Sequence, residues 1–282
     1  LKKLHAFSYK LDDHYEYFHQ IIHSDITKLE KLYLKEERFD TIREGTRIFI
    51  AIANAIEAKE VITSGVGVRE GIFLSKLLKN YEYQFPNRIN PSIISMQDRF
   101  DKTLKRYESL IQSALELYKL LSKNLEIEDS IDYSMELISA IKLSNIGKSL
   151  TIYHVNEHAF YIASQELNYK YRHEEIMLIS MLLRMQGKDI KKSLHYQSYK
   201  MFLPKRRIFK LLNFCYALSV ALYENAKDAT IDFEYQNRVL TIRCNRSLYI
   251  SKNTILKIAK PKKFDIKITD ASAMPSIETI VG

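Results

Sequence analysis

Glycine and proline are scarce in this sequence, with seven and five among 282 residues. Both residue types mark turns and loops, so their scarcity favours helices over turn-rich β structure. Cysteine is scarce too, because Cys215 and Cys244 are the whole complement and form no C-x-x-C pair or disulfide framework. The cysteine usage indicates a reducing cytoplasm rather than secretion.

Long apolar runs and targeting segments are also missing. The longest uncharged apolar run, residues 211–223, is shorter than the roughly 20 residues that a bilayer span requires. No signal peptide is recognisable at the start, where Leu1 leads directly into a Lys-rich helical pattern. We therefore expect no membrane association, and we interpret the chain as a piece of a longer protein.

Positive charge is present in excess, and it is unevenly distributed. Residues 165–270 contain 21 Lys and Arg against 10 Asp and Glu, whereas residues 1–164 contain 22 against 23. A one-sided positive surface attracts polyanions such as nucleic acid, polyphosphate or an acidic membrane surface. The alternative is a solvated basic surface without a partner.

The stretch at 61–80 combines a strand pattern, a glycine turn and a helix pattern. Residues 61–63 are a short β-branched run typical of a buried strand. Gly65 and Gly67 interrupt it, and apolar residues at helical spacing follow. A helix N-terminus behind such a turn favours anions, and Arg69 and Glu70 would contact a phosphate or a hydroxyl. A tight turn with an incidental Arg–Glu pair is the alternative.

The segment SGVGVREG (64–71), with Arg43-Glu44-Gly45 upstream of an apolar helix, resembles the exopolyphosphatase / guanosine pentaphosphate phosphohydrolase family. In that family the corresponding segment closes the second lobe of an actin-like core. The resemblance implies that the catalytic glutamate and the two phosphate-binding loops lie upstream of Leu1. It continues, more weakly, through most of the remaining chain.

Helical periodicity covers most of the first 226 residues. The pattern of residues 1–40 predicts one or two amphipathic helices, and the apolar run at 48–56 predicts a buried helix. The strand at 61–63 has no predicted neighbour in this sequence, so we expect its sheet partners to come from residues outside it. After a linker at 81–96, we expect helices over 97–125, 133–146, 157–167, 174–186 and 206–226. For His5, His14, His19 and His23 no third metal ligand is evident in the sequence, and we expect them to be surface or core histidines.

The segment at 143–163 resembles the place where the family carries its version of the HD phosphohydrolase motif. The metal-binding His-Asp pair is replaced here by Ser144-Asn145, which are poor ligands. The resemblance therefore implies a bundle that keeps the fold without its metal site. His154 and His158 remain nearby, and we expect a structural or phosphate-contacting role for them.

Basic residues accumulate beyond this segment. Where the family often shows Arg-Tyr-His-Arg-Lys, this chain keeps Arg184 and Lys188 but no histidine. Lys205, Arg206 and Arg207 open a predicted helix, where the helix dipole disfavours positive charge unless an anion offsets it. We therefore predict a phosphate-binding role for these five residues, together with Gly65, Gly67, Arg69 and Glu70.

The last part of the chain changes to strand patterns at 230–235, 239–244 and 264–269, with a helix at 254–259 and a turn at Asn237-Arg238. Residues 270–282 resemble a loose tail. Taken together, we expect a mainly α protein with α/β parts. Its predicted domains are the end of an actin-like (ribonuclease H-like) lobe over 1–85, a degenerate HD-like helical domain over 96–226, and a small α/β end-domain with tail over 228–282.

Two functions from different classes follow. In the first, implied by the resemblance, the chain is the C-terminal part of a hydrolase acting on polyphosphate or guanosine pentaphosphate. Its partners would be that substrate and the missing N-terminal domain, and its cofactor a divalent cation (magnesium) not held by this chain alone. A second copy of the chain, forming a homodimer, is a further partner that the sequence leaves open. In the second, the chain is a non-catalytic module binding nucleic acid or a regulatory nucleotide.

Overall fold

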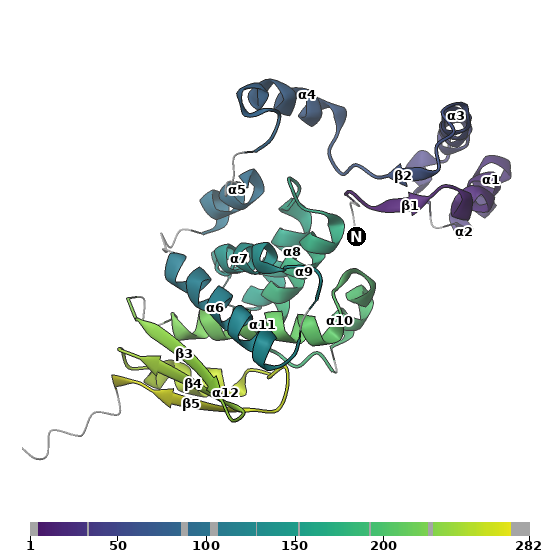
Figure 1. The fold of residues 1–282 in the computed structure, drawn as a ribbon. Coiled ribbons are helices and arrows are strands. Elements are labelled where there is room, and N and C mark those ends of the chain that lie inside the picture. Colours follow the sequence, from purple (N-terminus) through teal and green to yellow (C-terminus); the bar gives the residue numbers. More distant parts are fainter. Residues whose placement is uncertain are drawn as a thin grey trace, which may run out of the picture. The chain divides into compact units, whose positions relative to one another are not determined.

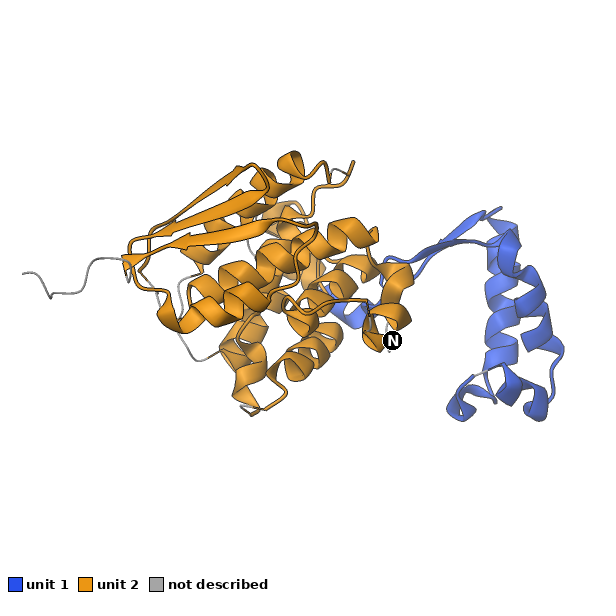
Figure 2. Ribbon diagram, turned by 90° about the horizontal axis from the view of Figure 1, so that it is seen from below, with its two compact units in different colours: residues 1–72 blue, residues 73–282 orange. Residues whose placement is uncertain are grey.

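The structure is a computed structural model that describes residues 5–32, 34–85, 90–101, 107–127, 129–151, 153–191, 193–224 and 228–271. It divides into two compact units, residues 1–72 and residues 73–282, coloured separately in Figure 2. Helices dominate the described part, and the strands there form two small sheets (Figure 1). The predicted mainly α architecture with α/β parts is confirmed at this level.

The first unit consists of short elements around a small core. Its strands are β1 (Ser8–Lys10) and β2 (Glu60–Ile62), and its helices are α1 (Tyr15–His23), α2 (Ile26–Lys31), α3 (Ile42–Ala55) and the start of α4 (Val68–Leu77), with 3-10 turns at Asp12–His14 and Glu36–Arg38. The Asp25 side chain caps α2 by accepting a hydrogen bond from the Lys28 amide at 2.9 Å. Ile21, Leu29 and Phe39 form the core of this unit.

The apolar run at 48–56 is helical, but the prediction that it is buried all round was wrong. Ile48, Ile52 and Ile56 are 61%, 56% and 69% exposed. α3 packs against α1, where the rings of Phe18 and Phe49 lie 5.5 Å apart. A helix packed along one side buries one face, so periodicity alone could not show which neighbours are present.

The strand β2 finds a partner within the chain. It pairs antiparallel with β1, and Tyr9 lies opposite Val61. Ile62 is 67% exposed, so the predictions of a buried strand and of a partner outside this sequence were wrong for this edge. β1 escaped prediction because it is three residues long and lies in a segment with a helical pattern.

The second unit begins with a helical assembly. After a 3-10 turn at Lys79–Tyr81, its helices are α5 (Pro91–Phe100), α6 (Glu108–Asn124), α7 (Ser134–Lys142), α8 (Val155–Glu166), α9 (His173–Met185), α10 (Leu194–Tyr199) and α11 (Arg206–Leu222), with further 3-10 turns at Ile146–Ser149 and Lys200–Phe202. The predicted helices at 133–146, 157–167, 174–186 and 206–226 correspond to α7, α8, α9 and α11, with ends shifted by a few residues.

The long helix predicted over 97–125 is interrupted. α5 already begins at Pro91, inside the predicted linker, because the Asn90 side chain caps it by accepting from the amides of Ser92 and Ile93. α5 ends at Phe100, and Asp101 adopts an extended conformation with φ −119° and ψ 92°. Two shorter helices therefore replace the predicted one.

A three-stranded sheet follows the helices. β3 (Ile231–Gln236) and β4 (Val239–Cys244) form an antiparallel hairpin, and β5 (Asp265–Thr269) lies parallel to β4 after the helix α12 (Tyr249–Lys257). The predicted turn at Asn237-Arg238 is confirmed, since both residues have positive φ, 49° and 61°, as a tight hairpin turn requires. Most of the predicted tail, residues 272–282, lies outside the described residues.

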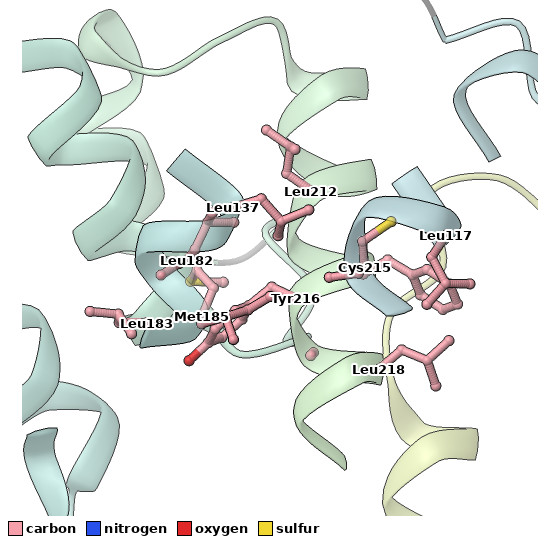
Figure 3. Close-up of a cluster of buried hydrophobic side chains, with 14 of the residues drawn as sticks. Leu117, Leu137, Leu182, Leu183, Met185, Leu212, Cys215, Tyr216 and Leu218 are labelled. Carbon is pink, nitrogen blue, oxygen red and sulfur yellow. The ribbon is translucent and has the colours of Figure 1, made fainter. Parts of the chain in front are cut away.

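The helices and the sheet of the second unit share one hydrophobic core. Figure 3 shows part of it, where α11 packs among α6, α7 and α9 through Leu117, Leu137, Leu182, Leu183, Met185, Leu212, Cys215, Tyr216 and Leu218. Leu240 and Ile242 from β4 and Phe264 before β5 belong to the same core. The α/β segment therefore packs directly on the helical segment.

The turn after α9 depends on a glycine. Gly187 has φ +80°, and a Cβ atom there would lie 2.8 Å from Cβ of Ala217. Its amide donates to Oδ1 of Asn213 at 2.9 Å, and its carbonyl accepts from the Ala259 amide at 2.8 Å. This turn thus ties α9 to α11 and to the segment after α12.

Among the helices that the structure describes, none combines the length and the apolar character of a membrane span.

Candidate functional site

The glycine turn lies between β2 and α4, as predicted, and two of its amides already have partners in the chain. The Gly65 amide donates to Nδ1 of His5 at 3.0 Å, and the Val66 amide donates to Oγ of Ser64 at 3.2 Å. A phosphate bound at this turn would compete with both contacts. The turn is therefore a structured loop in which these two backbone amides are already hydrogen-bonded and are not available to an anion.

Glu70 occupies the N-terminus of α4. A Cβ atom at Gly67 would lie only 2.6 Å from Oε2 of Glu70, so the carboxylate lies directly over this glycine. A negative charge here complements the helix dipole. Arg69 is exposed and forms no ion pair within the described part of the chain, so the incidental Arg69–Glu70 pair of the alternative interpretation is not made here. Arg69 is free to meet an anion, whereas Glu70 would have to swing aside.

The segment at 143–163 contains the residues that replace the His-Asp pair. Asn145 is 3% exposed, and its Nδ2 donates to the hydroxyl of Tyr107 at 3.1 Å. His154 starts α8 with φ 52°, and its Nδ1 lies 3.7 Å from Oε2 of Glu157. Within the described residues, no group of three or more His, Cys, Asp and Glu side chains comes together to hold a metal ion. The side chains of this segment therefore make packing and hydrogen-bond contacts.

Arg184 lies in α9 with its charge already offset. Its guanidinium donates to Oε1 of Glu157 at 3.2 Å and lies 2.6 Å from Nε2 of His195. It also stacks over Phe160, with 5.6 Å from Cζ to the ring centre. The side chain is 15% exposed, so Arg184 is better placed to connect α8, α9 and α10 than to bind an anion from solution.

The other predicted basic residues are exposed. Lys188 follows the Gly187 turn, and its carbonyl accepts from Nδ2 of Asn213 at 3.2 Å. Lys205 is the N-cap residue of α11, and Arg206 and Arg207 form its first turn, which contains no acidic residue. Lys188 is thus held beside the middle of α11, while Lys205, Arg206 and Arg207 lie at its start.

A positively charged cleft lies along this part of α11, and sequence reasoning did not identify it. Its volume is about 850 Å³, and its basic residues are Lys191, Lys210, Arg238, Lys260, Lys262 and Lys263. Asp265 is the one carboxylate among its described lining residues. Such a concentration of one charge sign raises the local concentration of polyanions.

Four segments form this cleft. Lys191 comes from the turn after α9, Lys210 from α11, and Arg238 from the β3–β4 turn, while Lys260, Lys262 and Lys263 precede β5. Lys260 donates to the Phe264 carbonyl at 2.6 Å, and Lys262 donates to the carbonyl of Leu125. These contacts fix two ammonium groups at the cleft wall, whereas Lys191 and Lys263 are exposed to solvent and Lys210 is half-buried.

Part of the cleft had a signal in the sequence. The run Lys260-Pro261-Lys262-Lys263 is a dense cluster of basic residues between a predicted helix and a predicted strand. Arg238 lies in the predicted hairpin turn. Arg238 and the lysines of this run lie near Lys191 and Lys210 only because the sheet packs on α11. Local sequence patterns do not encode that packing.

Comparison with known proteins identifies a family for the N-terminal part. The model of the Ppx/GppA phosphatase family matches residues 4–80, a range that includes Arg43-Glu44-Gly45 and the glycine turn. A search of curated proteins gave no match. The predicted resemblance is therefore confirmed over residues 4–80, the part of the chain that matches the model of the Ppx/GppA phosphatase family.

Proposed function

We propose that this chain is the C-terminal part of a hydrolase that cleaves phosphoanhydride bonds of inorganic polyphosphate or guanosine pentaphosphate. The match of residues 4–80 to the Ppx/GppA phosphatase family carries the proposal. The cleft of about 850 Å³, with six Lys and Arg residues against one Asp, supports it, because both substrates are polyanions.

In this proposal the chain contributes binding rather than the reacting groups. Arg69 and the turn around Gly65 and Gly67 form the rim of the catalytic cleft. Glu70 at the same turn orients Arg69 or accepts a hydrogen bond from a substrate hydroxyl. In the second unit, Lys188, Lys205, Arg206 and Arg207, with the positively charged cleft, are the proposed polyanion-binding groups. Arg184 stiffens this surface through Glu157 rather than contacting phosphate.

The reacting groups are assigned to upstream residues of the same protein. There, water would attack a terminal phosphoryl group with a glutamate as base. The family resemblance implies magnesium, but the described residues of this chain do not fit it, since no three suitable ligands come together. We therefore place the metal ligands in the N-terminal domain as well.

We further propose the fold relationships that the resemblance implies. Residues 1–85 would complete an actin-like lobe, and 96–226 would be an HD-derived bundle in which Ser144-Asn145 replaced the metal-binding pair. The two buried free cysteines, Cys215 and Cys244, are consistent with a cytoplasmic protein.

The first experiment compares phosphate release from polyphosphate by residues 1–282 and by the full-length protein. We expect turnover only by the full-length protein. Comparable turnover by residues 1–282 would contradict the upstream placement of the reacting groups.

A second experiment tests the cleft by polyphosphate binding to residues 1–282. Charge reversal at two cleft residues, Lys210→Glu with Lys263→Glu, should weaken binding by roughly tenfold or more at low salt. Lys123→Glu with Lys252→Glu is the matched control, since it changes the net charge equally and both residues are exposed and do not line the cleft. Equal loss in both variants would mean that net charge alone attracts the polyanion.

Competition separates this proposal from a nucleic-acid-binding module. Short polyphosphate should displace a labelled oligonucleotide from the chain if the cleft recognises phosphate chains. Displacement by nucleic acid but not by polyphosphate would favour the non-catalytic module.

A further inference from the structure

A second, larger cavity lies in the helical part of the second unit. Its volume is about 1300 Å³, and it lies among α5, α6, α7 and the start of α9. Its apolar lining comes from Ile93, Ile111, Leu115, Met135 and Ile138. A concave, largely apolar cavity of this size is typical of a site for a small organic molecule.

The charges around this cavity have the opposite sign to those of the positively charged cleft. Among its described lining residues, the carboxylates are those of Asp98, Asp101, Glu108, Glu136 and Glu175, and the ammonium groups are those of Lys142 and Lys170. A phosphate chain would be repelled here, in a protein whose net charge is +9. The cavity therefore does not extend the proposed substrate site.

One of these carboxylates is buried. Glu136 is 7% exposed and lies in the first turn of α7. Among the described residues, no Lys, Arg or His forms an ion pair with it. Burial raises the pKa of Glu136 to about 7, and the charges of Glu175 and Asp132 add to this effect.

Several of the other polar groups of the cavity have partners within the chain. The Ser139 and Tyr171 hydroxyl groups lie 2.6 Å apart, and Nε2 of Gln97 donates to the Lys142 carbonyl at 2.9 Å. The Glu175 carboxylate accepts from the Arg172 amide at 2.6 Å. Glu136 is thus the buried carboxylate that a positively charged ligand would stabilise, because a buried charge without a counter-ion is costly.

We propose that this cavity binds a small organic amine, with the ammonium group at Glu136 and the apolar body against Ile111, Leu115 and Ile138. A metal ion does not fit the same place, since no group of three suitable ligands occurs among the described residues. The cavity is then a ligand site of the helical part, separate from the handling of polyphosphate and independent of the proposed hydrolysis.

The test uses three probes with the same six-carbon tail: hexylamine, hexanol and hexanoate. Binding to residues 1–282 is followed by NMR through the methyl groups of Ile111, Met135 and Ile138. Hexylamine should shift these signals and bind roughly tenfold more tightly than hexanol, with hexanoate weakest. Equal affinities for the three probes, or no shift at these methyl groups, would overturn the proposal.

A matched pair of variants isolates Glu136. Glu136→Gln preserves the shape of the side chain and should reduce hexylamine affinity by roughly tenfold while leaving hexanol binding unchanged. Glu224→Gln removes an exposed carboxylate that does not line the cavity, and it should change neither affinity. Undiminished hexylamine binding by the Glu136→Gln variant would contradict the role of Glu136.

The pH dependence of the unmodified chain gives a measurement that needs no variant. Asp132 and Glu175 act on Glu136 from neighbouring segments, and Tyr171, Lys142 and Lys170 border the same space. Hexylamine affinity should rise by up to about tenfold between about pH 6 and pH 8 as Glu136 ionises. A fall in affinity over this range would instead mean that protonated Glu136 donates to a neutral ligand, and it would overturn the proposal.

Discussion

The backbone amide of Gly65 donates a hydrogen bond to Nδ1 of His5 at 3.0 Å, which fastens the glycine turn to the residue that leads into β1. Beside it, the Ala6 amide donates to the Thr63 carbonyl at 2.9 Å. The glycine turn is therefore held by contacts distant in sequence.

Removing the imidazole should loosen this turn. In the His5→Ala variant the Gly65 amide loses its acceptor, and its hydrogen exchange should accelerate by about fivefold, which corresponds to about 1 kcal/mol for one hydrogen bond. Exchange at the Thr63 amide, which donates to the Phe7 carbonyl, is the internal control. Equal rates at Gly65 in both proteins would show that another group protects this amide.

Arg69 is the residue of the glycine turn best placed to meet a phosphate. In the full-length protein, Arg69→Ala should lower kcat/KM for polyphosphate by roughly tenfold or more, as expected for the loss of a charged hydrogen bond. Lys76→Ala, a change of an exposed cation in the last turn of the same helix, should have little effect. Unchanged kinetics in a folded Arg69→Ala protein would show that Arg69 is an exposed surface residue that does not bind phosphate.

Gly187→Ala should destabilise the second unit by about 2 kcal/mol or more. An L-residue at φ +80° is strained, and its Cβ would clash with Ala217 and Ile258. Gly71→Ala is the matched control, because it lies in α4 with open space around it and should cost nothing. Urea unfolding measures both, and equal stabilities would show that the Gly187 turn can relax.

Glu136 should make stability depend on pH. Its pKa of about 7 in the folded protein exceeds the ordinary value of 4.5, so the folded state binds more protons between these values. The free energy of unfolding should therefore fall as pH rises from about 4.5 to about 7, by up to about 3 kcal/mol.

Comparing urea unfolding at several pH values checks this sign. Glu136→Gln should flatten the decline, because glutamine does not titrate, whereas Glu224→Gln should leave it as in the unmodified chain. The same slope in the Glu136→Gln variant would place the titrating group elsewhere.

Features encoded in short segments could be predicted from the sequence. The Ser64–Gly67 turn before α4 and the hairpin turn at Asn237-Arg238 follow from residue types that tolerate few other conformations. The apolar faces of α7, α8, α9 and α11 were likewise evident from their spacing. What periodicity could not provide was the neighbour of each face, which is why exposed Ile48 and Ile52 were predicted to be buried.

The candidate sites depend on contacts that are distant in sequence. Lys191, Arg238 and Lys263 share a cleft only because the sheet packs on α11. Arg184 matched the expected basic pattern, yet Glu157 and His195 from other helices engage it. Glu136 has no distinguishing sequence signal, since its burial arises from the packing of α7.

The core shared by the helices and the sheet limits how this protein can be shortened. Leu240, Ile242 and Phe264 pack in the same cluster as Leu212 and Leu218, so removing the sheet would uncover apolar side chains of α11. A truncated protein ending after α11 would tend to aggregate, because it would present that uncovered surface to water. Expression boundaries intended to isolate the helices should therefore retain the chain through β5.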